Sequence, residues 1–203
     1  METLLLPLVA VRLEVRRVNP SDAADLVVAA QRGDPGAFAQ LYERFAAMVH
    51  GILLSHVKER EVPDLFQDVF LSALRSLGSL KEPENVGAWL ASIARNRARD
   101  WQRSPGRQAE SLDGTLDPPD PRAQADADPG DPEEARRALE TIRALPEAYR
   151  ETLVLRLVEG LSGPEIAERC GLTHGSVRVN LHRGMKLLRE RLELARKGSQ
   201  GSP

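Results

Sequence analysis

The stretch "SGPEIAERCGLTHGSVRVNLHRGMKLLRERL" (residues 162–192) predicts two helices joined by a tight turn. Ser162 and Glu165 have the spacing of a capping box at the start of the first helix. Gly171 can end that helix in the left-handed conformation, and Thr173 can cap the helix that follows. The second helix then has a buried stripe at helical spacing, made by Val177, Leu181, Leu188 and Leu192.

The opposite face of this second helix is polar and basic. Its residues are Ser176, Arg178, Val179, Asn180, His182, Arg183, Lys186 and Arg189. In a helix-turn-helix, the second helix enters the major groove of DNA and its first turns reach the base edges. The capping box, the small Ala167 four residues before Gly171 and the basic face together indicate such a motif. The alternative is an ordinary helical hairpin.

A second basic helix is predicted at "WLASIARNRARDWQR" (89–103). Its apolar side comprises Trp89, Leu90, Ile93, Ala94, Ala98 and Trp101. Arg95, Arg99 and Arg103 stack at i, i+4 and i+8, where like charges repel by a few tenths of a kcal/mol per pair. This arrangement predicts an anionic partner. The two tryptophans could stack on bases, but their place in the apolar stripe favours core packing.

The segment "DLFQDVFLSALRSL" (64–77) predicts an amphipathic helix with one unusual position. The expected core stripe is Leu65, Phe66, Val69, Phe70, Ala73, Leu74 and Leu77. The other face is Asp64, Gln67, Asp68, Leu71 and Arg75. Leu71 lies at the centre of this polar face, so it is either an isolated surface leucine or part of a protein interface.

The chain pattern is helix after helix, which predicts an all-α fold of two small domains. We expect a disordered N-terminal extension (1–20), a helical domain (21–103), a flexible acidic linker (104–131), a helix-turn-helix domain (132–196) and a disordered tail (197–203). The net charge of −2 averages opposed blocks: +4 over 95–107, −8 over 108–134 and +5 over 173–197. The acidic linker could mimic nucleic acid or serve as a solvated spacer.

Several classes of protein are excluded by composition. Cys170 is the only cysteine, which rules out a disulfide framework, and we expect a core position rather than a redox sensor. The four histidines have no ligand spacing, so no metal or other cofactor is expected. No catalytic constellation is present, which argues against an enzyme. The segment "LLLPLVAV" near the N-terminus is too short to span a bilayer, and we expect a cytoplasmic protein without membrane insertion.

Three of these stretches, "DLFQDVFLSALRSL", "WLASIARNRARDWQR" and "EGLSGPEIAERCGLTHGSVRVNLHRG", resemble the extracytoplasmic-function (ECF) branch of the bacterial sigma-70 family. The similarity covers residues 21–103 and 136–193 in the expected order. It implies a region 2 helical bundle and a region 4 helix-turn-helix. The implied function is a sigma factor that brings RNA polymerase to promoters and opens the −10 region.

The resemblance also implies partners and site residues. Core polymerase would contact the protein through its β′ coiled coil and β flap, with the β′ site at Asp64, Gln67, Asp68, Leu71 and Arg75. The −10 element would meet Arg95, Asn96, Arg99 and Arg103, beside a loop (78–87) that resembles the family's pocket for an unstacked base. The −35 element would meet Ser176, Arg178, Val179, Asn180, Arg183 and Lys186. Many members are held inactive by an anti-sigma factor, which is a further candidate partner.

Two points qualify the resemblance. Asn180 stands where family members often have a basic residue, and a neutral amide favours adenine where arginine favours guanine. The 28-residue linker could reach roughly 90 Å, whereas promoter elements about 17 base pairs apart are roughly 58 Å apart. The linker thus permits both contacts without setting their spacing. The alternative function is a stand-alone helix-turn-helix regulator.

Overall fold

The chain is helical throughout the part that the structure describes. In this computed structural model the described residues are 20–104 and 132–199. They form eight α-helices and three short 3-10 helices and include no strand, which confirms the all-α prediction. The expected N-terminal extension up to residue 19, the linker from 105 to 131 and the last residues 200–203 lie outside the described part.

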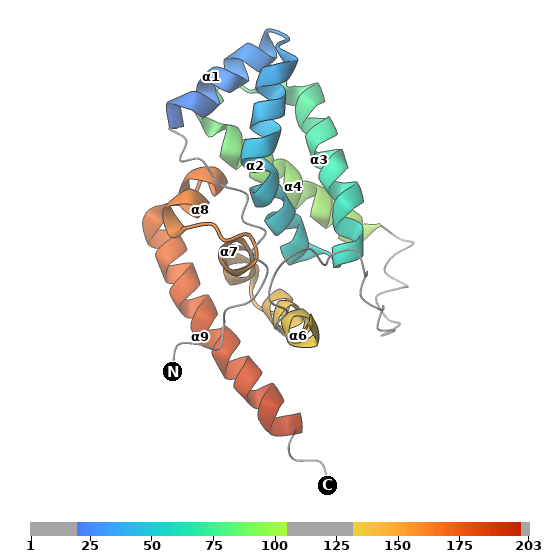
Figure 1. Cartoon of the computed structure of the whole chain (residues 1–203), viewed down its shortest axis with the longest axis vertical. Helices are drawn as coiled ribbons and strands as arrows, with labels where there is room; N and C mark the ends of the chain where they lie inside the picture. The colour runs from blue at the N-terminus through green and yellow to red at the C-terminus, as the bar shows by residue number, and fades with distance from the viewer. Residues whose placement is uncertain (1–19, 105–131, 200–203) are drawn as a thin grey trace.

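The first half of the molecule is a bundle of four helices (Figure 1). They are α1 (Pro20–Gln31), α2 (Pro35–His56), α3 (Val62–Ser76) and α4 (Val86–Arg103). The 3-10 turns Glu59–Glu61, Leu77–Ser79 and Pro83–Asn85 connect the last three. Asp34 caps α2, since its carboxylate accepts hydrogen bonds from the amides of Gly36 at 2.8 Å and Ala37 at 3.3 Å.

The second half contains the helix-turn-helix. Its helices are α6 (Pro132–Arg143), α7 (Glu147–Leu157), α8 (Gly163–Cys170) and α9 (His174–Ser199). The predicted capping box is confirmed: the Ser162 amide donates to Glu165 at 2.8 Å, and the Glu165 amide donates back to the Ser162 hydroxyl at 3.4 Å. Gly171 has the expected left-handed φ of 67°. Helix α9 runs to Ser199, past residue 196 where we expected the domain to end.

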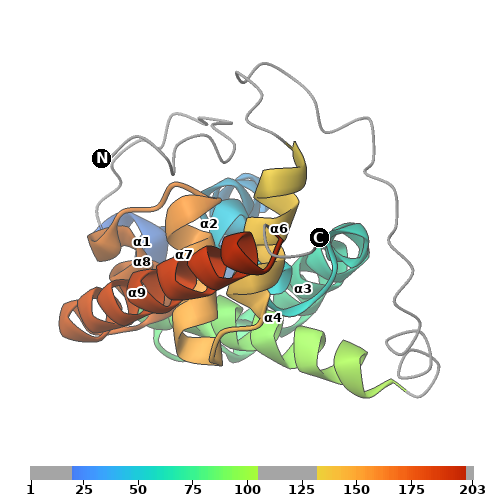
Figure 2. The ribbon, with the colours of Figure 1, turned by 90° about the horizontal axis from the view of Figure 1, so that it is seen from below.

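The two halves pack directly against each other. Helix α2 contacts α7, and α4 contacts α8. Fully buried residues of the first half, such as Ile52 and Leu53, belong to the same apolar cluster as Ile142 and Leu153 of the second half. Helices α6 and α7 contact α2 of the first half, whereas α9 packs on α6, α7 and α8 (Figure 2). The sequence predicted only a flexible tether between the halves, so this contact is a new finding.

Two glycines mark the closest approach of the halves. A Cβ atom on Gly87, in the first turn of α4, would lie 2.4 Å from the carbonyl oxygen of Arg169 in α8. A Cβ atom on Gly171 would lie 2.5 Å from the Cβ of Ala88. The backbone at Gly87 therefore meets the backbone of Arg169, the backbone at Gly171 meets the methyl group of Ala88, and neither position has room for a side chain.

Two expectations about local structure are wrong. Leu74, assigned to the core stripe of α3, has 54% of its surface exposed. The buried face of α3 centres on Leu65, Val69 and Ala73, and Leu74 lies beyond its edge. The loop expected at 78–87 is also shorter, because Val86 and Gly87 already belong to α4 and Pro83–Asn85 is a 3-10 turn.

Candidate nucleic-acid interface

The first turns of α9 present the predicted −35 residues to solvent. Ser176, Arg178, Val179, Arg183 and Lys186 are exposed, and Asn180 is half-buried. Val177 and Leu188, each only 1% exposed, fix the opposite side of α9 in the core. Thr173 caps the helix, since its hydroxyl accepts a hydrogen bond from the Ser176 amide at 3.1 Å. The structure therefore brings these predicted residues together on one accessible face.

This α9 face carries positive charge that no side chain in the described segments neutralises. Arg178, Arg183 and Lys186 have no ion pair among the described residues. Unpaired, exposed cations on the outer face of a helix-turn-helix are suited to DNA phosphates and base edges.

The predicted −10 residues on α4 fall into two groups. Asn96 and Arg103 are exposed to solvent. Arg95 instead forms a bidentate pair with Glu151 of α7, with distances of 2.9 Å from Nε and 2.6 Å from Nη2. Arg99 pairs with Glu147, at the start of the same helix, at 3.0 Å. The sequence predicted an anionic partner for this row of arginines. For Arg95 and Arg99, that partner is a pair of glutamates in the second half of the same chain.

Glu151 is a buried carboxylate whose ionisation depends on this pairing. Its side chain is only 7% exposed. Burial acts to raise its pKa, but hydrogen bonding to Arg95 and His56 and the positive charge of both groups outweigh burial and hold the pKa at about 2. The same hydrogen bonds raise the pKa of Arg95. The two groups therefore form a fully charged pair across the contact of the halves.

Sequence reasoning missed Glu147 and Glu151. A usable signal was present for Glu151, which begins the stretch "ETLVL" (151–155), every residue of which is buried. A carboxylate in such a stretch requires a cationic partner. Its position did not indicate that the partner would be Arg95, 56 residues earlier.

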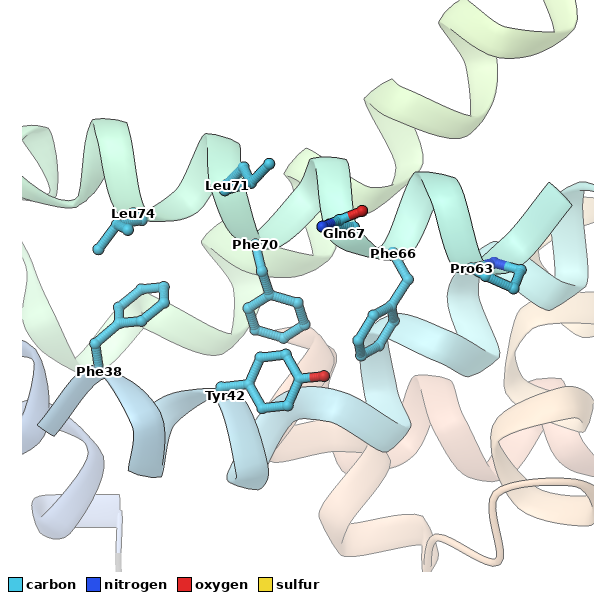
Figure 3. A pocket seen from close by; sticks show the side chains of 8 residues that line it. All are labelled: Phe38, Tyr42, Pro63, Phe66, Gln67, Phe70, Leu71 and Leu74. Atoms are coloured by element: carbon cyan, nitrogen blue, oxygen red, sulfur yellow. The ribbon is translucent and has the colours of Figure 1, made fainter. Parts of the chain in front are cut away.

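The predicted polymerase face of α3 is accessible. Asp64, Gln67, Asp68, Leu71 and Arg75 are all exposed, with Leu71 at 43%. Beside this face is a pocket of about 450 Å³ between α2 and α3, lined by Phe38, Tyr42, Pro63, Phe66, Gln67, Phe70, Leu71 and Leu74. Phe66 and Phe70 point from α3 toward Tyr42 on α2 (Figure 3), with ring centroids 5.7 and 4.6 Å from that of Tyr42. The contribution of α2 to this surface was not predicted.

The remaining candidates have structural positions. Trp89 and Trp101 are half-buried and pack against the core, as predicted. Cys170 is buried, and burial raises the pKa of its thiol to about 12, which confirms a core position. Within residues 20–104 and 132–199, no cluster of side chains could hold a metal ion. No helix in these segments is long and apolar enough to cross a membrane.

Comparison with protein-family models gives two matches in the order of the two halves. Residues 41–108 match the model of sigma-70 region 2. Residues 135–188 match the model of sigma-70 region 4. The first range includes α3 and α4, and the second includes the helix-turn-helix.

Similar proteins and structures agree with these matches. RNA polymerase sigma factor CarQ of Myxococcus xanthus is 37% identical over 161 residues, which cover 79% of this chain and 91% of CarQ. The ECF RNA polymerase sigma-E factor of Haemophilus influenzae is 31% identical, covering 83% of this chain and 94% of that protein.

Among solved structures, the sigma factor RpoE in complex with the anti-sigma factor NepR from Bartonella quintana is 26% identical. It has a TM-score of 0.51 and covers 77% of this chain and 96% of that chain. CnrH, solved with the cytosolic domain of CnrY, has a TM-score of 0.57 and is 24% identical, covering 85% of this chain and 98% of CnrH. At this identity the comparison shows that the two proteins share a fold. By its two family regions and its relatives, the chain belongs to the ECF branch of the sigma-70 family of RNA polymerase sigma factors.

Proposed function

We propose that this ECF sigma factor recognises the −35 element through the exposed face of α9. The observation that carries this proposal is the set of cations on α9, Arg178, Arg183 and Lys186, which have no acidic partner in the described part of the chain. They lie on the second helix of a helix-turn-helix whose cap and turn are well formed. Arginine reads guanine bidentately, and lysine binds phosphate, so both sequence and backbone contacts are available.

The −10 element is assigned to α4 and to the segment before it. Arg95, Asn96, Arg99 and Arg103 supply the contacts, and residues 78–87 capture an unstacked base. Nothing in the sequence provides for nucleotide hydrolysis, so binding energy must drive the opening of DNA. Unstacking a base costs a few kcal/mol, which capture in a pocket can offset. We therefore expect modest melting power and a requirement for promoters close to consensus.

Core polymerase is assigned to the α3 face that carries Leu71. The exposed leucine and the aromatic pocket beside it offer apolar surface at the centre of a charged rim, as protein interfaces do. Polymerase would hold the two DNA-binding surfaces at the promoter spacing. The protein would then act in the cytoplasm as an initiation factor, with no catalytic role of its own.

An anti-sigma factor is a further candidate partner. RpoE was solved in complex with the anti-sigma factor NepR. CnrH was solved in complex with the cytosolic domain of CnrY. The alternative of a stand-alone helix-turn-helix regulator is not favoured, because it leaves the region 2 match and the α3 face without a role.

Run-off transcription with purified core polymerase on a random promoter library tests this function. Wild-type protein should select templates that share two conserved elements, and Arg183→Ala should weaken selection at the −35 element alone. Arg32→Ala, a change to an exposed arginine in the turn after α1, serves as the control and should select the same templates as wild type. Transcription no better than that of core polymerase alone would refute the proposal.

A further inference from the structure

Gln31, the last residue of α1, joins that helix to the segment between α3 and α4. Its side-chain amide nitrogen donates hydrogen bonds to two backbone carbonyl oxygens, that of Leu77 at 3.0 Å and that of Leu80 at 2.9 Å. Leu77 begins the 3-10 turn Leu77–Ser79, and Leu80 is its C-cap. A glutamine amide carries two N–H donors. Gln31 therefore uses its whole donor capacity to hold both ends of one short turn, which lies 46 to 49 residues further along the chain.

Helix α1 is a firm base for this bridge. Ala23 and Val27 bury its inner face, and Val27 has no exposed surface at all. The helix also contacts both 3-10 turns of the segment, Leu77–Ser79 and Pro83–Asn85. The position of the Gln31 amide is thus fixed by the core of the first half.

The segment from Leu77 to Val86 is held at its two ends and open between them. Leu77 and Val86 are buried, and Leu80 is half-buried against the core. None of the five residues between Leu80 and Val86 is buried. Within that stretch, Asn85 is bonded to Glu82 alone, through its side chain and through its amide at 3.0 Å. The course of the exposed part therefore depends on how its ends are held, and the bridge from α1 holds the first end.

We propose that Gln31 is a positioning residue for the −10 element, which holds this segment in the conformation that captures the unstacked base. The inference rests on the proposed assignment of residues 78–87 to that base. A segment that is ordered before binding loses less conformational freedom when the base enters. More of the binding free energy then remains to offset the cost of unstacking. In this role Gln31 need not touch DNA, because it acts through the carbonyl groups of Leu77 and Leu80.

The test is the full-length Gln31→Met variant. Methionine has a similar length and nearly the same helix propensity as glutamine, adds no charge and has no N–H donor. Gln40→Met is the matched control, because it makes the same change at an exposed glutamine of α2 whose amide donates within its own helix, to the carbonyl oxygen of Gly36 at 3.4 Å.

Two quantities are measured. The first is hydrogen exchange of the Leu80 and Asn85 amides in the free protein, since each donates within the segment at 3.0 Å and reports its local order. The second is base selection by the holoenzyme at each position of the −10 and −35 elements, taken from transcription of a random promoter library. A loss of overall stability would lower transcription from all templates alike, whereas a misplaced segment weakens selection at one −10 position.

Gln31→Met should exchange these two amides about two- to tenfold faster than wild type, the factor expected for one exposed neutral hydrogen bond. Selection at one −10 position should fall by a similar factor, with −35 selection unchanged. Gln40→Met should match wild type in both. Unchanged exchange would overturn the positioning role. Faster exchange with intact −10 selection would instead remove residues 78–87 from base capture, which separates the two failures. Equal losses at −10 and −35 would also overturn the role.

A second variant restores the donors. Gln31→Lys carries three N–H donors at the end of a long side chain, and a cation is favourable at the end of α1. Its amides at Leu80 and Asn85 should exchange more slowly than those of Gln31→Met. Equal exchange in the two variants would show that hydrogen bonds from this position do not order the segment.

Discussion

Replacing Gly87 by alanine adds one methyl group at the tightest point between the two halves. The new Cβ would lie 2.4 Å from the carbonyl oxygen of Arg169 and 3.1 Å from its carbonyl carbon. Both are backbone atoms of α8, so the clash cannot be relieved by rotating a side chain. The halves must move apart by about 1 Å at this point, and such overpacking costs about 1–3 kcal/mol.

This cost applies only while the two halves are packed together. Alanine is favoured over glycine in a helix by at most about 1 kcal/mol, but that gain applies to α4 whether the halves are packed or separated. The ratio of packed to separated molecules should therefore fall about 5- to 150-fold. Overall thermal stability should change less, since the gain in α4 offsets part of the loss.

Energy transfer between dyes on the two halves measures the change. Glu43→Cys on α2 and Glu190→Cys on α9 place labels at exposed positions. Cys170 should stay unlabelled, because it is buried and its pKa is raised to about 12. Gly78→Ala is the control, since a Cβ there has nothing within 4 Å. If Gly87→Ala transfers energy as efficiently as Gly78→Ala, the packing of α4 on α8 is not present in solution.

Three further outcomes are expected. The packing of the two halves should be strongest at mildly acidic pH. His50 of α2 pairs at 2.6 Å with Glu159, which follows α7, and this hydrogen bond raises the pKa of His50. The contribution of that pair is lost as pH rises through the raised pKa, whereas the contribution of Glu151 is lost only as pH falls from 4.5 toward 2. A flat profile of energy transfer against pH would contradict this. Asn180→Arg should change the preferred base at one −35 position in the promoter library, from adenine toward guanine, and an unchanged preference would count against that contact. Leu71→Asp should weaken binding to core polymerase at least tenfold in a pull-down titration. The control Leu194→Asp, at a leucine of α9 that is 68% exposed, should leave binding unchanged. Equal effects of the two variants would remove Leu71 from the interface.

Local rules were sufficient for most of the fold. The capping box at Ser162, the left-handed Gly171 and the cap at Asp34 depend on residues within four positions of one another, and all three were predictable. The partner of Arg95 was not, because Glu151 lies 56 residues away and only packing of the halves brings the two together. Leu74 was misassigned for a related reason, since helical spacing places it near the edge of the core, but the packing of α2 and α4 on α3 determines where that edge lies.

Gly171 meets two physical constraints at one position. Its left-handed backbone forms the bend of the DNA-reading motif, and its missing side chain admits Ala88. A mutation of Gly171 would therefore disturb the turn and the packing of the halves together. A variant whose halves are separated should instead be sought at Ala88, where a bulkier residue would press on Gly171 and leave the turn itself unchanged.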